Sequence, residues 1–304
     1  VNENKTGNGA NGGYGCMGGE GLRGGAGGGI ANDGTLSLIN STVNDNATGN
    51  GGSGYQERGG NGGIGGGIAN GGTLSLINST LSGNTTGFGS SGCCVSSNGG
   101  HGGGIYNSNV VSITNSTLSD NATGDGVSPT NPVSTNGGDG GGIYNTNTLS
   151  VFDSTLNNNT TGQGINGGSR GRGSAVFLSG SAIFVNTIIA GNSSTENCYD
   201  VWPTDGGYNL DSGNTCGFTT INHSLVNTDP LLWVLGNYGG PVQTVPLRGG
   251  SPAIDAIPLG DNGCGTTITT DARGVPRPQG AACDIGAFEG YVYLYYYSFP
   301  VILR

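Results

Sequence analysis

The chain has 304 residues, of which 67 are glycine and 11 are proline, and only 9% are charged, with a formal net charge of -10. This composition lies at the edge of the low-complexity range, but a disordered chain carries far more charge. The 9 lysine and arginine residues cannot form the basic face of a nucleic-acid-binding protein, and no apolar run reaches the ~18 residues of a membrane-spanning helix.

An internal repeat occupies roughly the first two thirds of the chain. Its first landmark is a run of glycines before an apolar residue, reduced to Gly-Ser-Ala in the last copy: Ile30, Ile68, Ile105, Ile143 and Val176. Its second landmark is a Thr or Ser two places after an Asn: Thr48, Thr86, Thr123, Thr161 and Ser194. The two landmarks are 18 residues apart in every copy, whereas the return to the next copy takes 20, 19, 20 and 15 residues. A block of fixed length therefore alternates with a glycine-rich excursion of variable length.

The fixed block is predicted to form strands. Leu36, Ser37 and Leu38 alternate with the period of a β-strand, and the block is too rich in Asn, Gly, Ser and Thr for a helix. Apolar residues recur in three columns: Ile30, Ile68, Ile105, Ile143 and Val176; Leu38, Leu76, Ile113, Val151 and Phe184; and Val1, Val43, Leu81, Leu118, Leu156 and Ile189. Three short apolar segments joined by polar corners, repeated in register, describe one coil of a parallel β-helix.

Asn residues mark the corners, where Asn tolerates left-handed backbone and its amide can bond to the neighbouring coils. They form three columns: Asn32, Asn70, Asn107 and Asn145; Asn40, Asn78, Asn115, Asp153 and Asn186; and Asn4, Asn46, Asn84, Asn121, Asn159 and Asn192. The sequence thus predicts an all-β solenoid of about five coils over residues 1–195. Long glycine-rich loops leave one side of it, at residues 7–29, 49–67, 87–104, 124–142 and 162–175. These loops pack either on one another or against neighbouring subunits.

Two sets of motifs resemble known proteins. The glycine run before Ile, the Leu-Ser-Leu strand and the Asn-Ser-Thr-Leu-Ser segment resemble right-handed parallel β-helix repeats of secreted bacterial surface proteins, including the polymorphic outer-membrane-protein-type repeats. Residues 196–290 are similar to the choice-of-anchor Q region that closes many such proteins, in Asp229-Pro230-Leu231, 236–241, 250–255, 270–274, Arg277-Pro278 and 283–289. The resemblance implies a right-handed coil and an exported protein at the cell surface, and it brings no catalytic residues. Residues 1–6 align with residues 43–48, so the chain is expected to start inside a repeat with an open first coil.

Seven cysteines are present. Cys198 and Cys216 flank a turn-rich stretch, and Cys264 and Cys283 bracket the motif from Asp271 to Arg277. Both pairs are predicted disulfides that staple a small C-terminal β region with little core of its own. Cys16 lies in the first excursion, and Cys93 and Cys94 lie in the third. Either Cys16 bonds to one of these two across two coils, or the three thiols link neighbouring molecules.

No catalytic, cofactor-binding or metal-binding residues are predicted. A polysaccharide-active β-helix enzyme needs paired carboxylates, or carboxylates with a metal and a base. The acidic residues of the repeats form no column, and His101 and His223 are far apart in the sequence. Asn46, Asn84, Asn121 and Asn159 begin Asn-x-Thr triplets and are candidate glycosylation sites, although Asn corners followed by strand-forming Thr generate such triplets by themselves.

The tail, residues 291–304, is apolar and rich in tyrosine. Its β-forming side chains are Tyr291, Val292, Tyr293, Leu294, Tyr295, Phe299, Val301, Ile302 and Leu303. Such a strand either packs on its own region or is donated to a neighbouring molecule.

These features favour a structural function outside the cell. Both ends of a parallel β-helix are templates for strand pairing. An open first coil that receives the C-terminal region or tail of the next subunit gives a filament, sheath or surface layer. The chain is then secreted, processed and its own partner, and surface glycans are further partners. An adhesin or glycan-binding stalk is the alternative interpretation, and a polysaccharide-active enzyme is the third.

Overall fold

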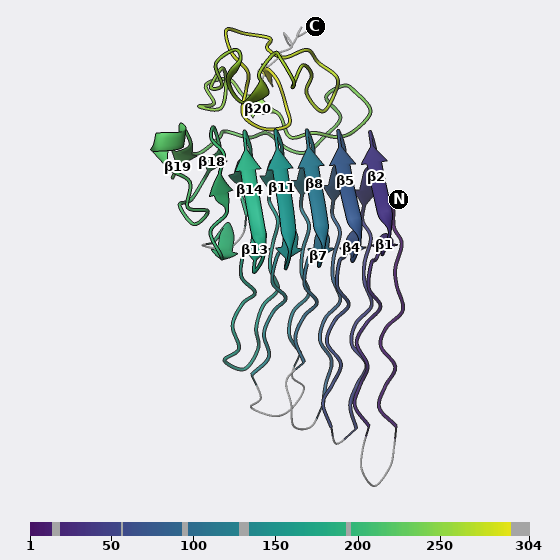
Figure 1. Ribbon diagram of the computed structural model, residues 1–304. Helices are drawn as coiled ribbons and strands as arrows, with labels where there is room; N and C mark the ends of the chain where they lie inside the picture. Colours follow the sequence, from purple (N-terminus) through teal and green to yellow (C-terminus); the bar gives the residue numbers. More distant parts are fainter. Residues whose placement is uncertain (14–18, 56, 93–96, 128–133, 193–195, 293–304) are drawn as a thin grey trace, which may run out of the picture.

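The computed structural model describes residues 1–13, 19–55, 57–92, 97–127, 134–192 and 196–292. Within them the chain is an all-β parallel solenoid, as the sequence predicts (Figure 1). One sheet contains β1 (Ile30–Asn32), β4 (Ile68–Asn70), β7 (Ile105–Asn107), β10 (Ile143–Asn145), β13 (Val176–Leu178) and β16 (Cys198–Asp200). The second contains β2 (Thr35–Ile39), β5 (Thr73–Ile77), β8 (Val110–Thr114), β11 (Thr148–Phe152), β14 (Ser181–Val185) and β17 (Thr204–Asp205).

The third sheet contains β3 (Thr42–Asn44), β6 (Thr80–Ser82), β9 (Thr117–Ser119), β12 (Thr155–Asn157), β15 (Ile188–Ala190), β18 (Leu210–Asp211) and β19 (Leu225–Val226). All three sheets therefore continue past the boundary expected at residue 195, the first to Asp200, the second to Asp205 and the third to Val226. The coils beyond residue 195 lack both the glycine-rich excursion and the long middle strand, and so the repeat is no longer visible in the sequence. The remaining elements are β20 (Leu247–Arg248), β21 (Tyr291–Val292) and two 3-10 helices, Thr220–Asn222 and Asp261–Gly263.

The core is a set of apolar columns that run along the solenoid. The predicted columns pair in register, for example Ile30 with Ile68 and Leu38 with Leu76, and their members Ile105, Ile113 and Leu118 are 0% exposed. The structure adds a fourth inward column that the sequence analysis did not identify as one: Leu74, Val111 and Leu149, all 0% exposed. The sequence signal for this column is the period-two pattern Leu36-Ser37-Leu38, which places both leucine side chains on one face of a strand.

Two of the predicted asparagine columns are hydrogen-bonded ladders. Asn70 donates from Nδ2 to Asn107 Oδ1 at 2.8 Å, and Asn84 donates in the same way to Asn121 Oδ1 at 2.9 Å. The column from Asn40 to Asn186 occupies the left-handed region, with φ between 47° and 52°. These are its members: Asn40, Asn78, Asn115, Asp153 and Asn186. Both roles assigned to Asn from the sequence are thus confirmed.

The glycine-rich excursions pack on one another. Each has an outgoing arm and a returning arm, and the arms of successive coils lie side by side below the sheets in Figure 1. Gly51 N–H donates to Phe88 O in the next outgoing arm at 3.0 Å, and Gly52 N–H donates to Leu22 O in a returning arm at 2.8 Å. Asn50 N–H donates to the Asn8 side chain at 3.0 Å. The next three residues, 53–55, repeat this rotation of partners with a period of three, which is the period of a polyproline II helix.

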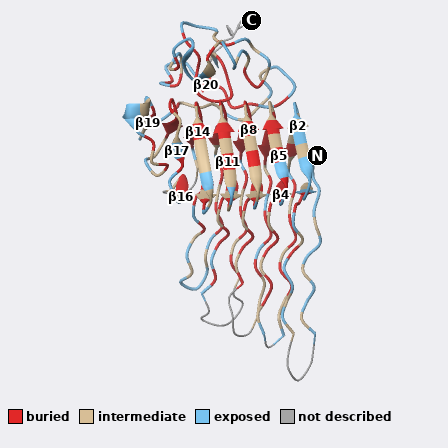
Figure 2. Cartoon of the chain, viewed as in Figure 1, coloured by how far each residue is buried: buried red, intermediate tan, exposed pale blue. Residues whose placement is uncertain are grey.

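Glycine is required where an arm faces its neighbours. A Cβ atom on Gly51 would lie 1.9 Å from Gly60 O, and one on Gly99 would lie 1.7 Å from Gly124 O. Side chains occur at the remaining position of the period, where Asn50 and Asn98 accept N–H groups of the next coil. Much of the length of the arms is consequently buried (Figure 2). The question left open by the sequence is resolved within one chain: the excursions form a second, self-packed layer.

The C-terminal end of the core is closed by a small plug. The Phe218 ring packs edge-on against Phe184 with centroids 6.0 Å apart, and it is 6% exposed. The Cys198–Cys216 disulfide belongs to the same core cluster. Thus the solenoid ends in a loop tied back onto its last full coil.

The flanking region, residues 228–292, lies along the side of the solenoid opposite the glycine arms (Figure 1). It contacts successive corners: Thr80 Oγ1 donates to Gln243 O at 2.5 Å, Asn115 Nδ2 to Thr270 O at 2.9 Å, and Gly286 N to Asn186 O at 2.9 Å. The resemblance in the sequence implies that this region lies at the end of the solenoid. The region instead binds polar corners that the repeat provides in every coil.

Candidate functional site

The first coil exposes part of the core. Among the described residues, β1 and β2 each have a strand partner on one side only. Leu36 and Leu38 are half-buried, whereas their equivalents Leu74 and Leu76 are 0% exposed, and Ile39 is 55% exposed. Asn2 pairs with Asn44 in β3, and Lys5 pairs with Ala47 just after β3. Neither pairs with β1 or β2. This end of the solenoid is a strand edge with an apolar surface beside it.

The tail begins on its own region. Tyr291 pairs with Leu247 and Val292 pairs with Arg248 in a short parallel ladder. This is the first of the two arrangements expected for the tail, and it holds for these two residues. The other predicted assembly residues, Tyr293, Leu294, Tyr295, Phe299, Val301, Ile302 and Leu303, lie outside the described part of the chain.

Both predicted disulfides are present, Cys198–Cys216 and Cys264–Cys283. Disulfides of this kind persist in an oxidising compartment, which suggests a location outside the cytosol. Cys16, Cys93 and Cys94 lie outside the described residues, so neither of the two arrangements proposed for them is tested.

The four candidate glycosylation sites are ruled out by burial in the folded chain. Asn46, Asn84, Asn121 and Asn159 are each 0% exposed. Their amides form the inner ladder, and Asn121 Nδ2 donates to both Asn159 Oδ1 and Leu81 O. A glycan on any of them would have to occupy the core. The Asn-x-Thr triplets follow from the repeat.

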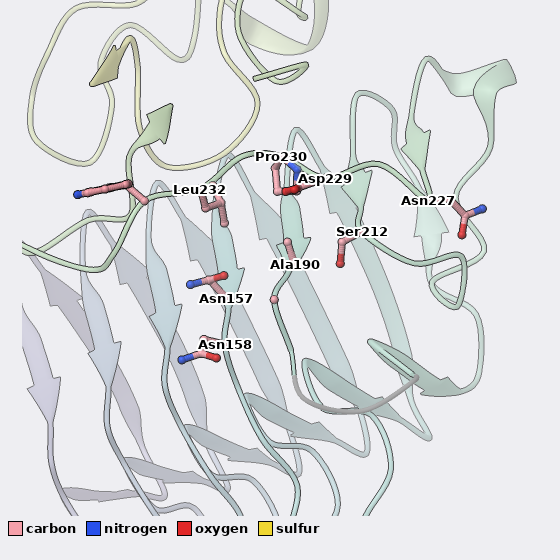
Figure 3. A pocket seen from close by; sticks show the side chains of 10 residues that line it. Asn157, Asn158, Ala190, Ser212, Asn227, Asp229, Pro230 and Leu232 are labelled. Carbon is pink, nitrogen blue, oxygen red and sulfur yellow. The ribbon is translucent and has the colours of Figure 1, made fainter. Parts of the chain in front are cut away.

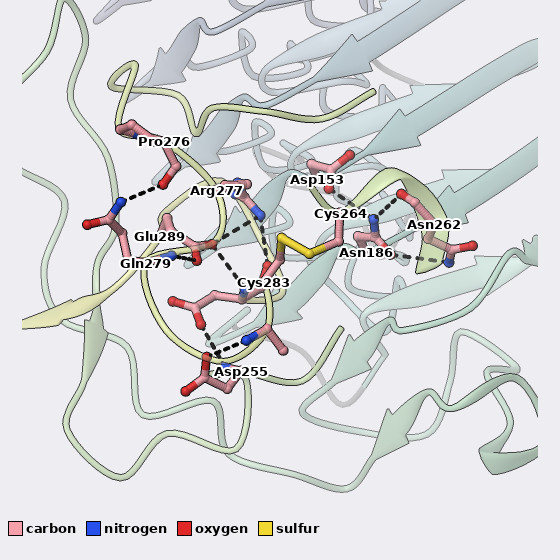
Figure 4. Close-up of a disulfide and its surroundings, with 12 residues drawn as sticks. Asp153, Asn186, Asp255, Asn262, Cys264, Pro276, Arg277, Gln279, Cys283 and Glu289 are labelled. Atoms are coloured by element: carbon pink, nitrogen blue, oxygen red, sulfur yellow. Dashed lines mark hydrogen bonds and ion pairs between the residues drawn. A yellow bond between two sulfur atoms is a disulfide. The ribbon is translucent and has the colours of Figure 1, made fainter. Parts of the chain in front are cut away.

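The motif residues near the second disulfide form a buried ionic network (Figure 4). Arg277 and Glu289 are 4% and 2% exposed, with Nη1 and Oε2 3.6 Å apart, and Arg277 donates to Asp284 O at 2.8 Å. Glu289 accepts the N–H groups of Gln279 and Asp284. Burial and the nearby Glu289 charge raise the pKa of Asp284 to about 7. These groups hold the loops of the flanking region in place.

Aromatic rings stack along the outer face of the first sheet. The Tyr144 ring lies 5.2 Å from Tyr106 and 4.8 Å from Phe177, both nearly parallel, and Phe177 lies 5.6 Å from Tyr199. Because the rings cover one another's faces, they present their edges to solvent. The stack is a cross-strand ladder that stabilises successive coils.

An open cavity of about 310 Å³ lies where this stack meets the returning arms. His101 Nδ1 accepts the N–H of Asp139 at 2.9 Å, and burial lowers the pKa of His101. Arg172 lies over the Tyr199 ring at 4.5 Å. His101, which stands among glycines in the sequence, thus gains its neighbours from the following coils. A neutral imidazole with an occupied Nδ1 positions the arm.

A second cavity, of about 470 Å³, lies between the solenoid and the start of the flanking region (Figure 3). Its lining is polar on the solenoid side and apolar on the other: Asn157, Asn158, Ala190, Gly191, Ser212 and Asn227 on the first, and Pro230, Leu232 and Trp233 on the second, with Asp229 between them. In the sequence, Asp229-Pro230 stands out as part of a motif but not as part of a cavity. The missing information was the path of the chain after β19, which turns back along the solenoid.

Within the described ranges, no group of three or more His, Cys, Asp or Glu side chains could hold a metal ion. No helix in that part of the chain is long and apolar enough to cross a membrane. Comparisons of the chain with protein-family models, with curated proteins and with solved structures found no match.

Proposed function

We propose that this chain is a structural protein of the cell exterior that assembles head to tail into a filament, sheath or surface layer. The strand edge at β2 supports the proposal, because among the described residues β2 has a partner on one side only and lies beside the half-buried Leu36 and Leu38. Such an edge is a template for another strand. A second copy of the chain supplies that strand, and the contact repeats because each copy carries the same edge.

The body of the molecule suits a load-bearing role. Asparagine ladders and the self-packed arms connect every coil to the next, so that the solenoid is stiffened on two sides. The two disulfides and the resemblance to bacterial surface β-helix proteins support an extracellular location. A structural role is preferred to a catalytic one because the buried carboxylates of the flanking region bind backbone N–H groups.

The plug at the C-terminal end of the solenoid affects which segment of a second copy can pair with β2. Phe218 and the Cys198–Cys216 disulfide cover the last coil, so the donated strand comes from elsewhere in the second copy. We assign it to the apolar tail beyond Val292. A chain that ends at Val292 keeps the β20–β21 ladder and should remain folded but monomeric.

The edge is tested by Ser37→Pro with Ser37→Ala as the matched control. Asn40 N–H points to β5, so the N–H of Ser37, three residues earlier, points to the open side. Proline removes that donor without breaking a bond within the chain and is tolerated at edge strands. Sedimentation and negative-stain images should show assemblies for the native chain and for Ser37→Ala, and monomers for Ser37→Pro. A native chain that stays monomeric would overturn the proposal, and assemblies of Ser37→Pro would exclude this edge.

A further inference from the structure

The floor of the larger cavity is one column of equivalent positions on successive coils. Asn157 pairs directly with Ala190 across β12 and β15. Ile189 pairs with Asp211, and Asp211 pairs with Val226, so Ser212 and Asn227 continue the column on the next two coils. Neighbouring strands are about 4.8 Å apart, and the floor therefore extends about 14 Å along the solenoid.

The wall of the cavity runs beside this floor because the chain reverses after β19. Asp229 accepts the N–H of Leu231 at 2.8 Å, and Trp233 N–H donates to Pro246 O at 2.9 Å. The Arg248 guanidinium lies 5.4 Å from the Trp233 ring centre. These contacts fix the wall before any ligand arrives, which lowers the ordering cost of binding.

Two groups on the floor are free to bind. The side-chain amides of Asn157 and Asn227 have no hydrogen-bond partner within the described part of the chain, although both residues line the cavity. Each amide offers two donors and an acceptor oxygen. They stand at the two ends of the column, with the small Ala190 and Ser212 between them.

The lining selects a class of ligand. Amide and hydroxyl groups on one side and Pro230, Leu232 and Trp233 on the other match a molecule with hydroxyl edges and apolar C–H faces. Asp229 is the charged residue in the lining, Arg248 lies over the Trp233 ring but outside the lining, and the chain has a net charge of -10. An acidic polymer is therefore disfavoured. The length of the floor suits several linked units rather than one.

We propose that this groove binds an extended, uncharged oligosaccharide, with Asn157 and Asn227 as hydrogen-bonding groups and Trp233 as an apolar wall. The site is formed within one molecule and does not depend on the head-to-tail assembly. A binding experiment on this groove therefore tests the groove alone and leaves the proposed assembly to its own experiment.

Trp233 supplies a direct readout. The chain contains two tryptophans, and Trp202 is 76% exposed and lies outside the groove. Trp202→Phe leaves Trp233 as the single fluorophore. Neutral hexasaccharides of glucose, N-acetylglucosamine, mannose and xylose are titrated into this variant, with hexagalacturonate as the acidic comparison. We expect a saturable change in Trp233 emission with at least one neutral hexasaccharide and none with hexagalacturonate.

The matched pair of variants is Asn157→Leu and Asn44→Leu in the Trp202→Phe background. Asn44 pairs with Ser82, and so occupies the same place in the first coil as Asn157 does in the fourth, but it lies outside the groove. Asn157→Leu should weaken binding at least tenfold, and Asn44→Leu should leave it unchanged, with thermal melts confirming that both are folded. No saturable change with any neutral hexasaccharide, equal binding of hexagalacturonate, or equal effects of the two variants would overturn the proposal.

Discussion

Asn84 Nδ2 and Asn121 Oδ1 are 2.9 Å apart at the centre of the inner asparagine ladder, and Asn121 Nδ2 donates in the same way to Asn159 Oδ1. Asn121 also accepts the Asn84 backbone N–H and donates to Leu81 O. All donors and acceptors of one buried side chain are thereby used between coils. The ladder is a polar column inside the core that fixes the register of each coil against the next.

Asn121→Ala should therefore destabilise the chain strongly. It removes the acceptor of the buried Asn84 backbone N–H and the Nδ2 donor to Leu81 O and Asn159 Oδ1, and each buried group left unsatisfied costs about 1–3 kcal/mol. Asn121→Asp should be worse at pH 7, because it replaces a donor that faces Asn159 Oδ1 by a buried charge. Urea unfolding measures both free energies, and the exposed Asn147→Ala is the control. A loss no larger than that of the control would show that the ladder contributes little.

Gly99→Ala tests the packing of the arms. The new Cβ would lie 1.7 Å from Gly124 O, so two arms must separate, and we expect a loss of at least about 1–3 kcal/mol. Gly34→Ala is the matched control, since nothing lies within 4 Å of a Cβ at that exposed corner. Thermal melts of the two variants should differ by several degrees. Equal melting temperatures would mean that the arms are not closely packed in solution.

Asp153 gives the solenoid a pH dependence. Burial raises its pKa from 3.8 to about 6, with Arg277 and the Asn186 hydrogen bond acting in the opposite direction. The folded chain thus holds a proton between about pH 4 and 6 that the unfolded chain releases, and the stability from this group falls as the pH rises through that window. Asp153→Asn, which restores the asparagine of its column, should raise the melting temperature at pH 8. The gain should disappear below about pH 4, and a gain that is the same at pH 8 and pH 4 would contradict this assignment.

The Cys198–Cys216 disulfide should hold the terminal plug. It closes a loop with a sequence separation of 18, and a cross-link over a loop of that size contributes about 3 kcal/mol. Replacing both cysteines by Ala should lower the melting temperature and increase amide hydrogen exchange around Phe218. The Cys264–Cys283 double variant is the comparison, because its exchange should increase in the flanking region instead. Unchanged exchange at Phe218 would show that the ring is held by packing alone.

Part of the candidate groove could be predicted from the sequence, and part could not. Asn157 and Ala190 lie in strands that follow from periodicity, whereas Ser212 lies beyond the visible repeat. Their alignment with Asn227 depends on coils whose repeat has decayed, and the wall depends on a chain reversal that no local signal marks. The groove therefore becomes visible only when segments distant in sequence are placed side by side.

The sequence by itself determined the solenoid, because fixed spacing forces equivalent residues of successive coils into register. It also determined the asparagine corners and the two disulfide pairs, each of which is a local or nearly local constraint. Only the tertiary structure decided what the glycines do. The arms of one excursion bond to each other and to those of the next through backbone groups, which every residue carries. The glycines in the sequence therefore show that close approach is possible, but they do not show which segment is the partner. The position of the flanking region was decided in the same way, because it binds polar corners that recur in every coil.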